Sequence, residues 1–140
     1  RKNLFLKKIL KAISKILAKL IYGRYKKISI GNKYQFLIDS NFAFRNYENW
    51  GKGHNKGFTK LLDISKNKEV VFDIGAHIGL CTLPLSQLAS KVFSFEASPT
   101  NIKYLNKHLK INNSINVNAF SILTKHLKRY FYRSKKILFN

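Results

Sequence analysis

The segment VVFDIGAHIGLCTLPLS, from Val70 to Ser86, constrains the fold of this chain more than any other. Two apolar runs flank an acid, Asp73, and two glycines four residues apart, Gly75 and Gly79. In parallel α/β sheets, a buried strand that ends in a glycine turn and leads into a helix has this pattern. The segment therefore predicts a strand, a glycine loop and an apolar helix, in that order.

The alternation of strand and helix continues after this segment. Strands are expected at 70–73, 91–95 and 115–118, with 128–136 as a candidate for one more, and helices at about 78–88 and 99–111. Ser98 as a cap and Pro99 at the first helical position mark the start of the second helix. This order and spacing predict an α/β fold, a parallel sheet with right-handed crossovers and flanking helices.

The N-terminal part is organised differently. Apolar positions at helical spacing between Leu4 and Ile21, with lysines on the other side, predict a basic amphipathic helix that stops at Gly23. Such a helix either lies on an anionic membrane surface or covers the rest of the fold or a partner chain. We favour the covering role. A β-hairpin over 25–30 and 33–38, about a Gly-Asn turn, is expected next.

Residues 41–59 are rich in aromatics, asparagine and glycine, and hold the only tryptophan, Trp50, together with His54. We expect a structured loop that enters a helix over about 55–62. Such loops often line a pocket and as often pack their aromatics on the core, and the sequence leaves both open. The chain thus divides into a helix over 1–24, a hairpin with this loop over 25–68, and a partial α/β domain over 69–140.

The formal charge of +21 raises the question of a polyanionic partner. Lysine outnumbers arginine 22 to 5, however, and readers of bases and phosphates favour the bidentate fork of arginine. No aromatic-basic motif of a nucleic-acid module is present either, so we predict no nucleic-acid partner.

Cysteine usage and hydropathy bear on the location of the protein. The lone Cys81 excludes an internal disulfide and favours a reducing, cytoplasmic compartment. Lysines interrupt the apolar positions of the N-terminus, so no transmembrane helix is expected. A peripheral contact of the N-terminal helix with an anionic membrane stays compatible with the sequence.

The glycine loop implies a ligand at the carboxyl end of the strand before it. A glycine turn there brings the backbone and a helix N-terminus close to whatever binds. Gly75 has no side chain to block a ligand, and Gly79 allows the helix to pack tightly. Asp73 must be solvated, hydrogen-bonded or paired, which makes a cationic group of the ligand a good candidate.

Two nucleotide-type cofactors compete for this loop. A dinucleotide fingerprint needs Gly-x-Gly-x-x-Gly, and His77 stands where the second glycine belongs, so a pyrophosphate would be crowded and NAD is disfavoured. Glu96 follows Gly75 by 21 residues, at the end of the next strand, where a carboxylate can accept both hydroxyls of a ribose. S-adenosylmethionine, with its ribose, adenine and amino-acid tail, suits this pattern.

The two segments resemble the FkbM-type family of S-adenosylmethionine-dependent methyltransferases. That family typically shows an aspartate-glycine-alanine-asparagine/histidine-isoleucine-glycine loop and then a phenylalanine-glutamate-x-serine-proline turn. The matching positions are Asp73, Gly75, Ala76, His77, Ile78 and Gly79 in the loop, and Phe95, Glu96, Ser98 and Pro99 in the turn. Ala97 departs from the commoner proline. The resemblance covers about residues 47–118 and implies a Rossmann-like class I methyltransferase fold.

The resemblance also implies roles for single residues. The expected cofactor-binding residues are Asp73, Gly75, Ala76, His77 and Gly79 for the methionine end, Glu96 for the ribose hydroxyls, and Ala97 near the adenine. His77 either lines the cleft or caps the following helix. The alternative for Asp73 and Glu96 is a pair of capping carboxylates at strand ends, without a ligand.

The expected reaction is in-line transfer of a methyl group, for which the protein supplies alignment and desolvation. The resemblance suggests a hydroxyl of a glycan or natural product as the acceptor, with His54 as the only candidate base. His108 and His126 are expected to be solvated, and no spacing typical of a zinc site occurs. Methyltransferase domains of this type are longer, so we expect an incomplete domain. The rival hypothesis is a non-enzymatic basic module that binds a membrane or a partner.

Overall fold

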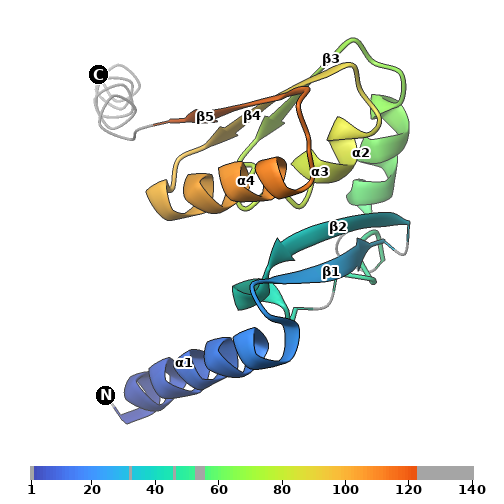
Figure 1. The fold of residues 1–140 in the computed structure, drawn as a ribbon. Helices are drawn as coiled ribbons and strands as arrows, with labels where there is room; N and C mark the ends of the chain where they lie inside the picture. Colours follow the sequence, from blue (N-terminus) through green and yellow to red (C-terminus); the bar gives the residue numbers. More distant parts are fainter. Residues whose placement is uncertain (1, 32, 46, 53–55, 123–140) are drawn as a thin grey trace, which may run out of the picture.

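The computed structural model describes residues 2–31, 33–45, 47–52 and 56–122 of the chain. Figure 1 shows four layers from top to bottom: a parallel sheet, the helices beneath it, a β-hairpin and the N-terminal helix. The elements in chain order are α1 (Lys2–Tyr22), β1 (Tyr25–Ile30), β2 (Tyr34–Asp39), η1 (Ser40–Phe42), α2 (Gly57–Ser65), β3 (Val70–Ile74), α3 (Thr82–Ser86), β4 (Lys91–Glu96), α4 (Pro99–Ile111) and β5 (Val117–Ser121). The predicted α/β fold with an N-terminal helix and hairpin is confirmed.

Strands β3, β4 and β5 form a parallel sheet in this order, and a helix connects each strand to the next. In the register, Asp73 of β3 lies opposite Ser94 of β4. Because the strands are parallel, their carboxyl ends meet at one edge, together with the loop after β3 and the N-terminus of α4. The fold therefore brings the two predicted motifs to the same place.

Helix α3 is much shorter than the helix expected over 78–88. Gly75, His77 and Gly79 all have positive φ angles, 84°, 53° and 97°, and divide the chain before α3 into tight turns. A non-glycine residue such as His77 adopts this left-handed conformation only at a cost in free energy. Strand β5 also begins two residues later than expected, after a turn at Asn113 with φ 52°. The candidate strand over 128–136 lies outside the described residues.

One hydrophobic core joins the hairpin to the sheet and its helices. Ile30 and Ile38 of the hairpin, Leu83 of α3 and Leu105 of α4 are fully buried and belong to a single contiguous cluster. Because of this shared core, the hairpin is an integral part of the fold. At the start of α4, the side chain of Ser98 caps the helix as predicted, since its Oγ accepts the N–H of Asn101 at 3.3 Å.

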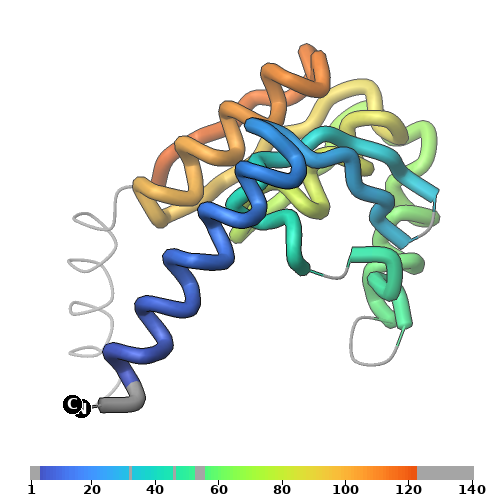
Figure 2. The backbone as a smooth tube through the Cα atoms, turned by 60° about the horizontal axis from the view of Figure 1, so that its bottom comes forward, coloured from blue at the N-terminus to red at the C-terminus, as the bar shows by residue number. Residues whose placement is uncertain are grey.

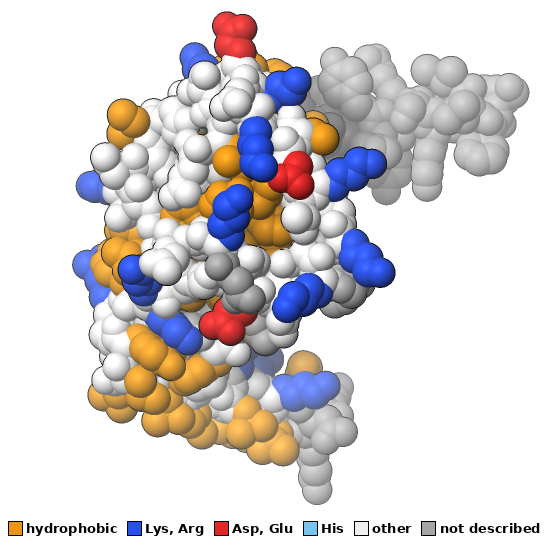
Figure 3. Space-filling model, turned by 90° about the vertical axis from the view of Figure 1, so that its right-hand side faces the viewer, with side chains coloured by type: hydrophobic (Ala, Val, Ile, Leu, Met, Phe, Trp, Pro, Cys, Tyr) orange, Lys and Arg blue, Asp and Glu red, His pale blue; other side chains and the backbone are white. Residues whose placement is uncertain are grey.

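Helix α1 projects away from the rest of the molecule (Figure 2). Its ten large apolar side chains are between 38% and 76% exposed. Figure 3 shows hydrophobic side chains gathered along the lower edge of the molecule, where α1 lies. The described part of the chain thus leaves this apolar face uncovered, and the covering role that we favoured is not fulfilled within it. None of the described helices has the length and hydropathy to cross a membrane.

Candidate functional site

Two carboxylates meet at the carboxyl edge of the sheet. Asp73 is the fourth residue of β3, and Glu96 is the last residue of β4, where its side chain is only 7% exposed. The negative charge of Glu96 acts on Asp73 strongly enough to contribute to the rise of its pKa. The structure therefore brings together the two acids on which the cofactor prediction rests.

Asp73 is oriented by a buried pair of hydroxyls. Thr82 Oγ1 donates a hydrogen bond to Asp73 Oδ2 at 2.5 Å, and Ser94 Oγ donates to Thr82 Oγ1 at 3.2 Å. Burial raises the pKa of Asp73 above its ordinary value, the hydrogen bond from Thr82 opposes this, and Glu96 adds to the rise. Thr82 and Ser94 are not among the site residues predicted from the sequence. The sequence does contain a hint of their role, because each is a polar residue within an apolar segment.

Glu96 clamps the glycine loop to the start of α4. Its Oε2 accepts the N–H of His77 at 2.7 Å, and its Oε1 accepts the N–H of Ser98 at 2.7 Å and the amide of Asn101 at 3.4 Å. Burial raises the pKa of Glu96, but these hydrogen bonds outweigh burial and hold the pKa below its ordinary value. Glu96 is therefore ionised at neutral pH, and it does make the capping contacts of the alternative interpretation.

Neither of these carboxylates is neutralised by a cationic side chain among the described residues. Asp63 pairs with Lys66 and Asp39 pairs with Lys107, away from this edge of the sheet. The lack of a cationic partner for Asp73 and Glu96 is unusual in a chain with 27 lysines and arginines and only six acids. Burying a charge without a partner is costly, so the edge of the sheet forms a negative site that a cationic ligand group would stabilise.

The glycine loop presents an open face at Gly75. A Cβ atom at this position would meet nothing within 4 Å, and a contact of this residue with a ligand stays a prediction. The N–H groups of Gly75 and Ala76 both donate to the carbonyl of Phe95, at 2.9 and 3.0 Å, and the side chain of Ala76 is buried in the core. Ala76 thus supports the loop and does not face a ligand with its side chain.

The other predicted loop positions have distinct surroundings. A Cβ atom at Gly79 would lie 2.8 Å from Leu105 Cδ1, so the tight packing predicted for Gly79 is against α4. The side chain of His77 is exposed, and the residue before α3 is Cys81, which makes no side-chain cap, so His77 does not cap that helix. Ala97 is exposed next to Glu96.

His108 is fully buried, which contradicts the prediction that it is solvated. Its Nε2 accepts the N–H of Asp39 at 2.9 Å, so its Nδ1 carries the proton and donates to the carbonyl of Ile78 at 2.8 Å. Burial lowers the pKa of His108, the hydrogen bond to Ile78 and the charge of Asp39 oppose this, and Lys107 adds to the lowering. The signal was present in the sequence, because Leu105 and Leu109 place His108 on the apolar face of α4.

The described residues offer little for acid–base or nucleophilic catalysis. Burial, and then the charge of Asp73, raise the pKa of the Cys81 thiol to about 12, so it stays protonated. His54, the candidate base, and His126 lie outside the described residues. The aromatic loop packs on the core, where Trp50 and Phe58 make an edge-to-face contact at 5.1 Å.

No family model matches this sequence. The chain is 31% identical over 101 residues to tRNA(Phe) (4-demethylwyosine(37)-C(7)) aminocarboxypropyltransferase of Methanocaldococcus jannaschii, which covers 71% of this chain and 39% of that protein. It is 29% identical over 66 residues to ribosomal RNA small subunit methyltransferase A of Wigglesworthia glossinidia brevipalpis, which covers 47% of this chain and 25% of that protein.

A similar solved structure is TYW2 of M. jannaschii in complex with AdoMet, that is, S-adenosylmethionine. It has a TM-score of 0.51 and 27% identity, over 70% of this chain and 43% of that chain. The chain has the fold of the S-adenosylmethionine-dependent methyltransferases. Its predicted fold is thereby confirmed, and the similar proteins are transferases, one of which binds the predicted cofactor, whereas the narrower FkbM-type resemblance stays a prediction. The chain matches less than half of the length of each of these proteins.

The prediction of no nucleic-acid partner, with a glycan or small molecule as the acceptor, is wrong. The relatives of this methyltransferase-fold chain are named for tRNA and ribosomal RNA. The prediction relied on the low arginine content, but lysine also neutralises backbone phosphates, as a point charge that needs no bidentate fork. The non-enzymatic module is not favoured either, since the relatives are transferases.

Proposed function

We propose that this chain binds S-adenosylmethionine at the edge formed by β3 and β4, and that it is the cofactor-binding part of an RNA-modifying transferase. The observation that carries the proposal is the pair of carboxylates, Asp73 and Glu96, which no lysine or arginine of the described residues neutralises. S-adenosylmethionine carries a sulfonium and an ammonium group, and both are cations.

The residues present fit this cofactor. A carboxylate offers about four acceptor positions, and the three donors to Glu96 leave a position on Oε2 for a ribose hydroxyl. The longest of the three contacts, from Asn101 at 3.4 Å, is weak enough for a second hydroxyl to replace it. Asp73 would hold the positively charged amino-acid end, and the open face of Gly75 would let the ligand approach the backbone.

The cofactor supplies an electrophilic carbon activated by the sulfonium charge. The residues of this chain bind and orient it. Thr82 and Ser94 hold the Asp73 carboxylate in one direction, and Glu96 fixes the loop against α4. Preorganised groups of this kind lower the entropic cost of alignment for in-line transfer.

Transfer of a methyl group and transfer of an aminocarboxypropyl group are both candidate reactions. The second is favoured by one observation, the name of the M. jannaschii relative. Attack on the methyl carbon releases S-adenosylhomocysteine, whereas attack on the neighbouring carbon of the amino-acid tail releases methylthioadenosine. Chromatography of the nucleoside product, after incubation with bulk tRNA or ribosomal RNA, therefore distinguishes the two.

RNA as the acceptor is supported by the relatives' names and by the net charge of +21. The FkbM-type resemblance, which suggests transfer to a hydroxyl oxygen, stays a hypothesis about the subgroup. On RNA, such a transfer would modify the ribose 2′-hydroxyl.

Isothermal titration of the chain with S-adenosylmethionine tests the cofactor proposal. We expect Glu96→Gln to weaken binding roughly 10- to 100-fold, because a hydrogen bond to a charged group contributes about 1.5–3 kcal/mol. Glu69→Gln is the matched control, since Glu69 is exposed just before β3, at the opposite edge of the sheet, and should leave the affinity unchanged. Equal affinity of Glu96→Gln and the wild type, or tighter binding of NAD, would refute the proposal.

A further inference from the structure

A groove of about 650 Å³ lies between the C-terminal end of α1 and the helix α4. The residues that line it include Lys19, Arg24, Asp39, Asn41, Tyr104 and Lys107. It is separate from the carboxyl edge of the sheet, and none of the cofactor-site residues lines it. The groove therefore needs an explanation of its own.

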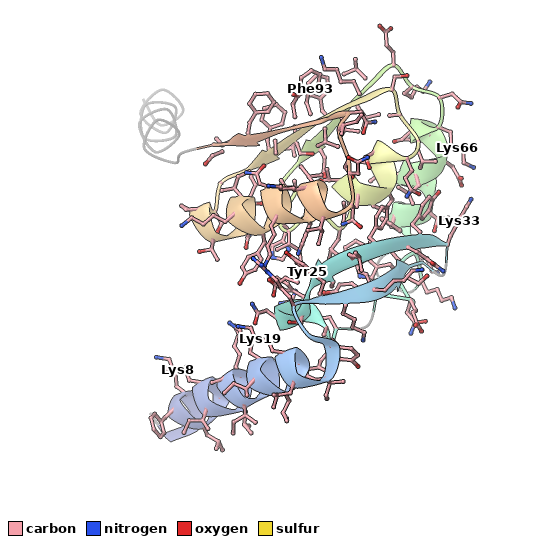
Figure 4. All side chains as sticks on the ribbon, in the orientation of Figure 1. Lys8, Lys19, Tyr25, Lys33, Lys66 and Phe93 are labelled. Atoms are coloured by element: carbon pink, nitrogen blue, oxygen red, sulfur yellow. The ribbon has the colours of Figure 1, made fainter. Side chains whose placement is uncertain are left out.

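Both walls of the groove are basic. Lys19 and Arg24 come from α1 and the turn after it, and Lys107 comes from α4. Figure 4 shows the side chains of Lys8 and Lys19 pointing from α1 toward the side on which α4 lies. The lysine face of α1 is thus turned toward the groove.

The one acid in the lining, Asp39, offsets Lys107 and leaves the other two basic residues uncompensated. Asp39 is 5% exposed and forms an ion pair with Lys107, and its Oδ1 accepts the N–H of Asn41 at 2.9 Å. The negative charge of Asp39 is therefore balanced by Lys107 and does not act on the other basic residues of the groove. Lys19 and Arg24 leave the groove with a positive excess that an anionic ligand would neutralise.

The floor of the groove is polar and held in place. The amide of Asn41 donates to Tyr104 Oη at 3.1 Å, and the Tyr104 ring packs edge-to-face on Phe42 at 4.9 Å. A phenol oxygen that accepts one hydrogen bond still has its own proton to donate. A phosphate held by Lys19 and Arg24 could therefore accept a hydrogen bond from the Tyr104 hydroxyl.

We propose that this groove binds the phosphate backbone of the RNA that the transferase modifies, an inference that rests on the proposed function. The concave, charged lining suits a chain of phosphates better than a flat lipid surface. A helix that lies on a membrane buries its apolar face in the lipid and keeps its lysines on the opposite, polar face, so such a contact would leave the lysine face free for RNA. In α1 the lysine face is turned toward the groove and the apolar face is exposed away from it.

Helix α4 links the groove to the cofactor edge. Ser98, which contacts Glu96, and Lys107, which lines the groove, are separated by nine residues, or about 14 Å along a helix. This length corresponds to roughly four stacked nucleotides. RNA held in the groove would therefore bring a nucleotide a few positions away to the site of transfer.

The test is the binding of a labelled single-stranded RNA of mixed sequence to the full chain, followed by fluorescence anisotropy at several salt concentrations. We expect Lys19→Gln/Arg24→Gln to reduce the slope of log K against log salt by about 1.4, because each phosphate contact contributes about 0.7. Lys107 is left intact because it pairs with Asp39. The matched control is Lys33→Gln/Lys60→Gln, with the same loss of charge at two exposed lysines on the hairpin turn and α2, away from the groove (Figure 4 labels Lys33).

Three results would overturn the proposal that this groove binds RNA. An equal loss in the two double variants would mean that only net charge matters. An unchanged slope in Lys19→Gln/Arg24→Gln would place the RNA elsewhere. Binding to phosphatidylserine vesicles without binding to RNA would assign the basic face to lipid. Titration of the same variants with S-adenosylmethionine separates these failures from a failure of the cofactor site, because neither pair of substitutions touches Asp73 or Glu96.

Discussion

Gly79 is the residue of the loop that tolerates a side chain least. Its φ angle of 97° lies in the left-handed region, and a Cβ atom there would lie 2.8 Å from Leu105 Cδ1. Leu105 is itself fully buried, so its side chain has little space into which to move. The glycine loop can therefore pack this closely against α4 only because Gly79 has no side chain.

We expect Gly79→Ala to lower the free energy of unfolding by about 2–3 kcal/mol. The left-handed backbone costs an alanine roughly 1–2 kcal/mol, and overpacking against Leu105 adds about 1 kcal/mol. Urea denaturation followed by circular dichroism measures the change. Gly57→Ala is the control, because Gly57 begins α2 without a positive φ angle and with open space around it, and it should be neutral or slightly stabilising. Equal losses in both variants would contradict the packing argument.

At the residue scale, the sequence predicted the groups whose chemistry forms a motif and missed those that act singly. Asp73 and Glu96 were found because an acid beside a glycine turn, and another at the next strand end, form a recognisable spacing. Thr82 and Asn101, which hold these acids, are single polar residues with no partner nearby in the sequence. Their role depends on contacts that only the folded chain creates.

His108 connects three elements through one imidazole ring. It belongs to α4, accepts the N–H of Asp39 at the end of β2, and donates to Ile78 in the glycine loop. The charged groups that face it are Asp39 and Lys107, and Phe42 and Tyr104 pack beside its ring. The ring must be neutral to make both hydrogen bonds, because a protonated ring has no acceptor.

We therefore expect the protein to lose stability between pH 7 and pH 5. The pKa of His108 is lowered in the folded chain, so the unfolded chain takes up the proton first as the pH falls below about 6.5. The stabilisation is complete above that pH and is lost by up to about 1.4 kcal/mol per pH unit below it. Urea denaturation at several pH values measures this slope, and His108→Gln should flatten it.

Tyr104→Phe is the control for this prediction. It removes the hydroxyl that the Asn41 amide contacts, but it keeps the imidazole and the ring beside it. The variant should retain the pH slope even if its stability differs from that of the wild type. A slope that disappears in Tyr104→Phe and persists in His108→Gln would assign the titration to another group.

At the element scale, the limits of prediction follow from the range of the forces involved. Helix α4 and the hairpin were predicted almost to the residue, because capping and alternation are local signals. The segment 78–88 is apolar throughout, so its periodicity could not show that turns occupy its first part and that α3 begins at Thr82. The side chain of Glu96, 19 residues further along the chain, stabilises these turns because its carboxylate accepts the N–H of His77.

The molecule as a whole is tied together across large separations in the sequence. Asn112 at the end of α4 exchanges two hydrogen bonds of 2.7 Å with the backbone of Leu37 in β2, 75 residues away. The Asp39–Lys107 ion pair and the bonds of His108 lie beside it. No local pattern predicts such contacts, and for this reason the sequence did not show that the hairpin and the α/β part share one hydrophobic core.

Because of these contacts, the hairpin side and the cofactor edge should unfold together. Trp50, the only tryptophan, packs on Phe58 and on the core and reports on the part of the chain around the hairpin. We expect its fluorescence and the circular dichroism of the helices to change at one melting temperature. S-adenosylmethionine at 100 times its Kd should stabilise the folded chain by about 2.7 kcal/mol, which corresponds to a shift on the order of 10 °C seen by both probes.

Glu96→Gln is the variant that tests the origin of this shift. It should melt in a single transition of its own, and at the same cofactor concentration it should show a much smaller shift, since it lacks the full carboxylate for the ribose hydroxyls. Glu69→Gln should shift like the wild type. If Trp50 melts below the helices, or ignores the cofactor while circular dichroism responds to it, then the bonds of Asn112, Lys107 and His108 do not couple the hairpin to the site. The cofactor edge would in that case be a unit that unfolds separately from the hairpin it packs against.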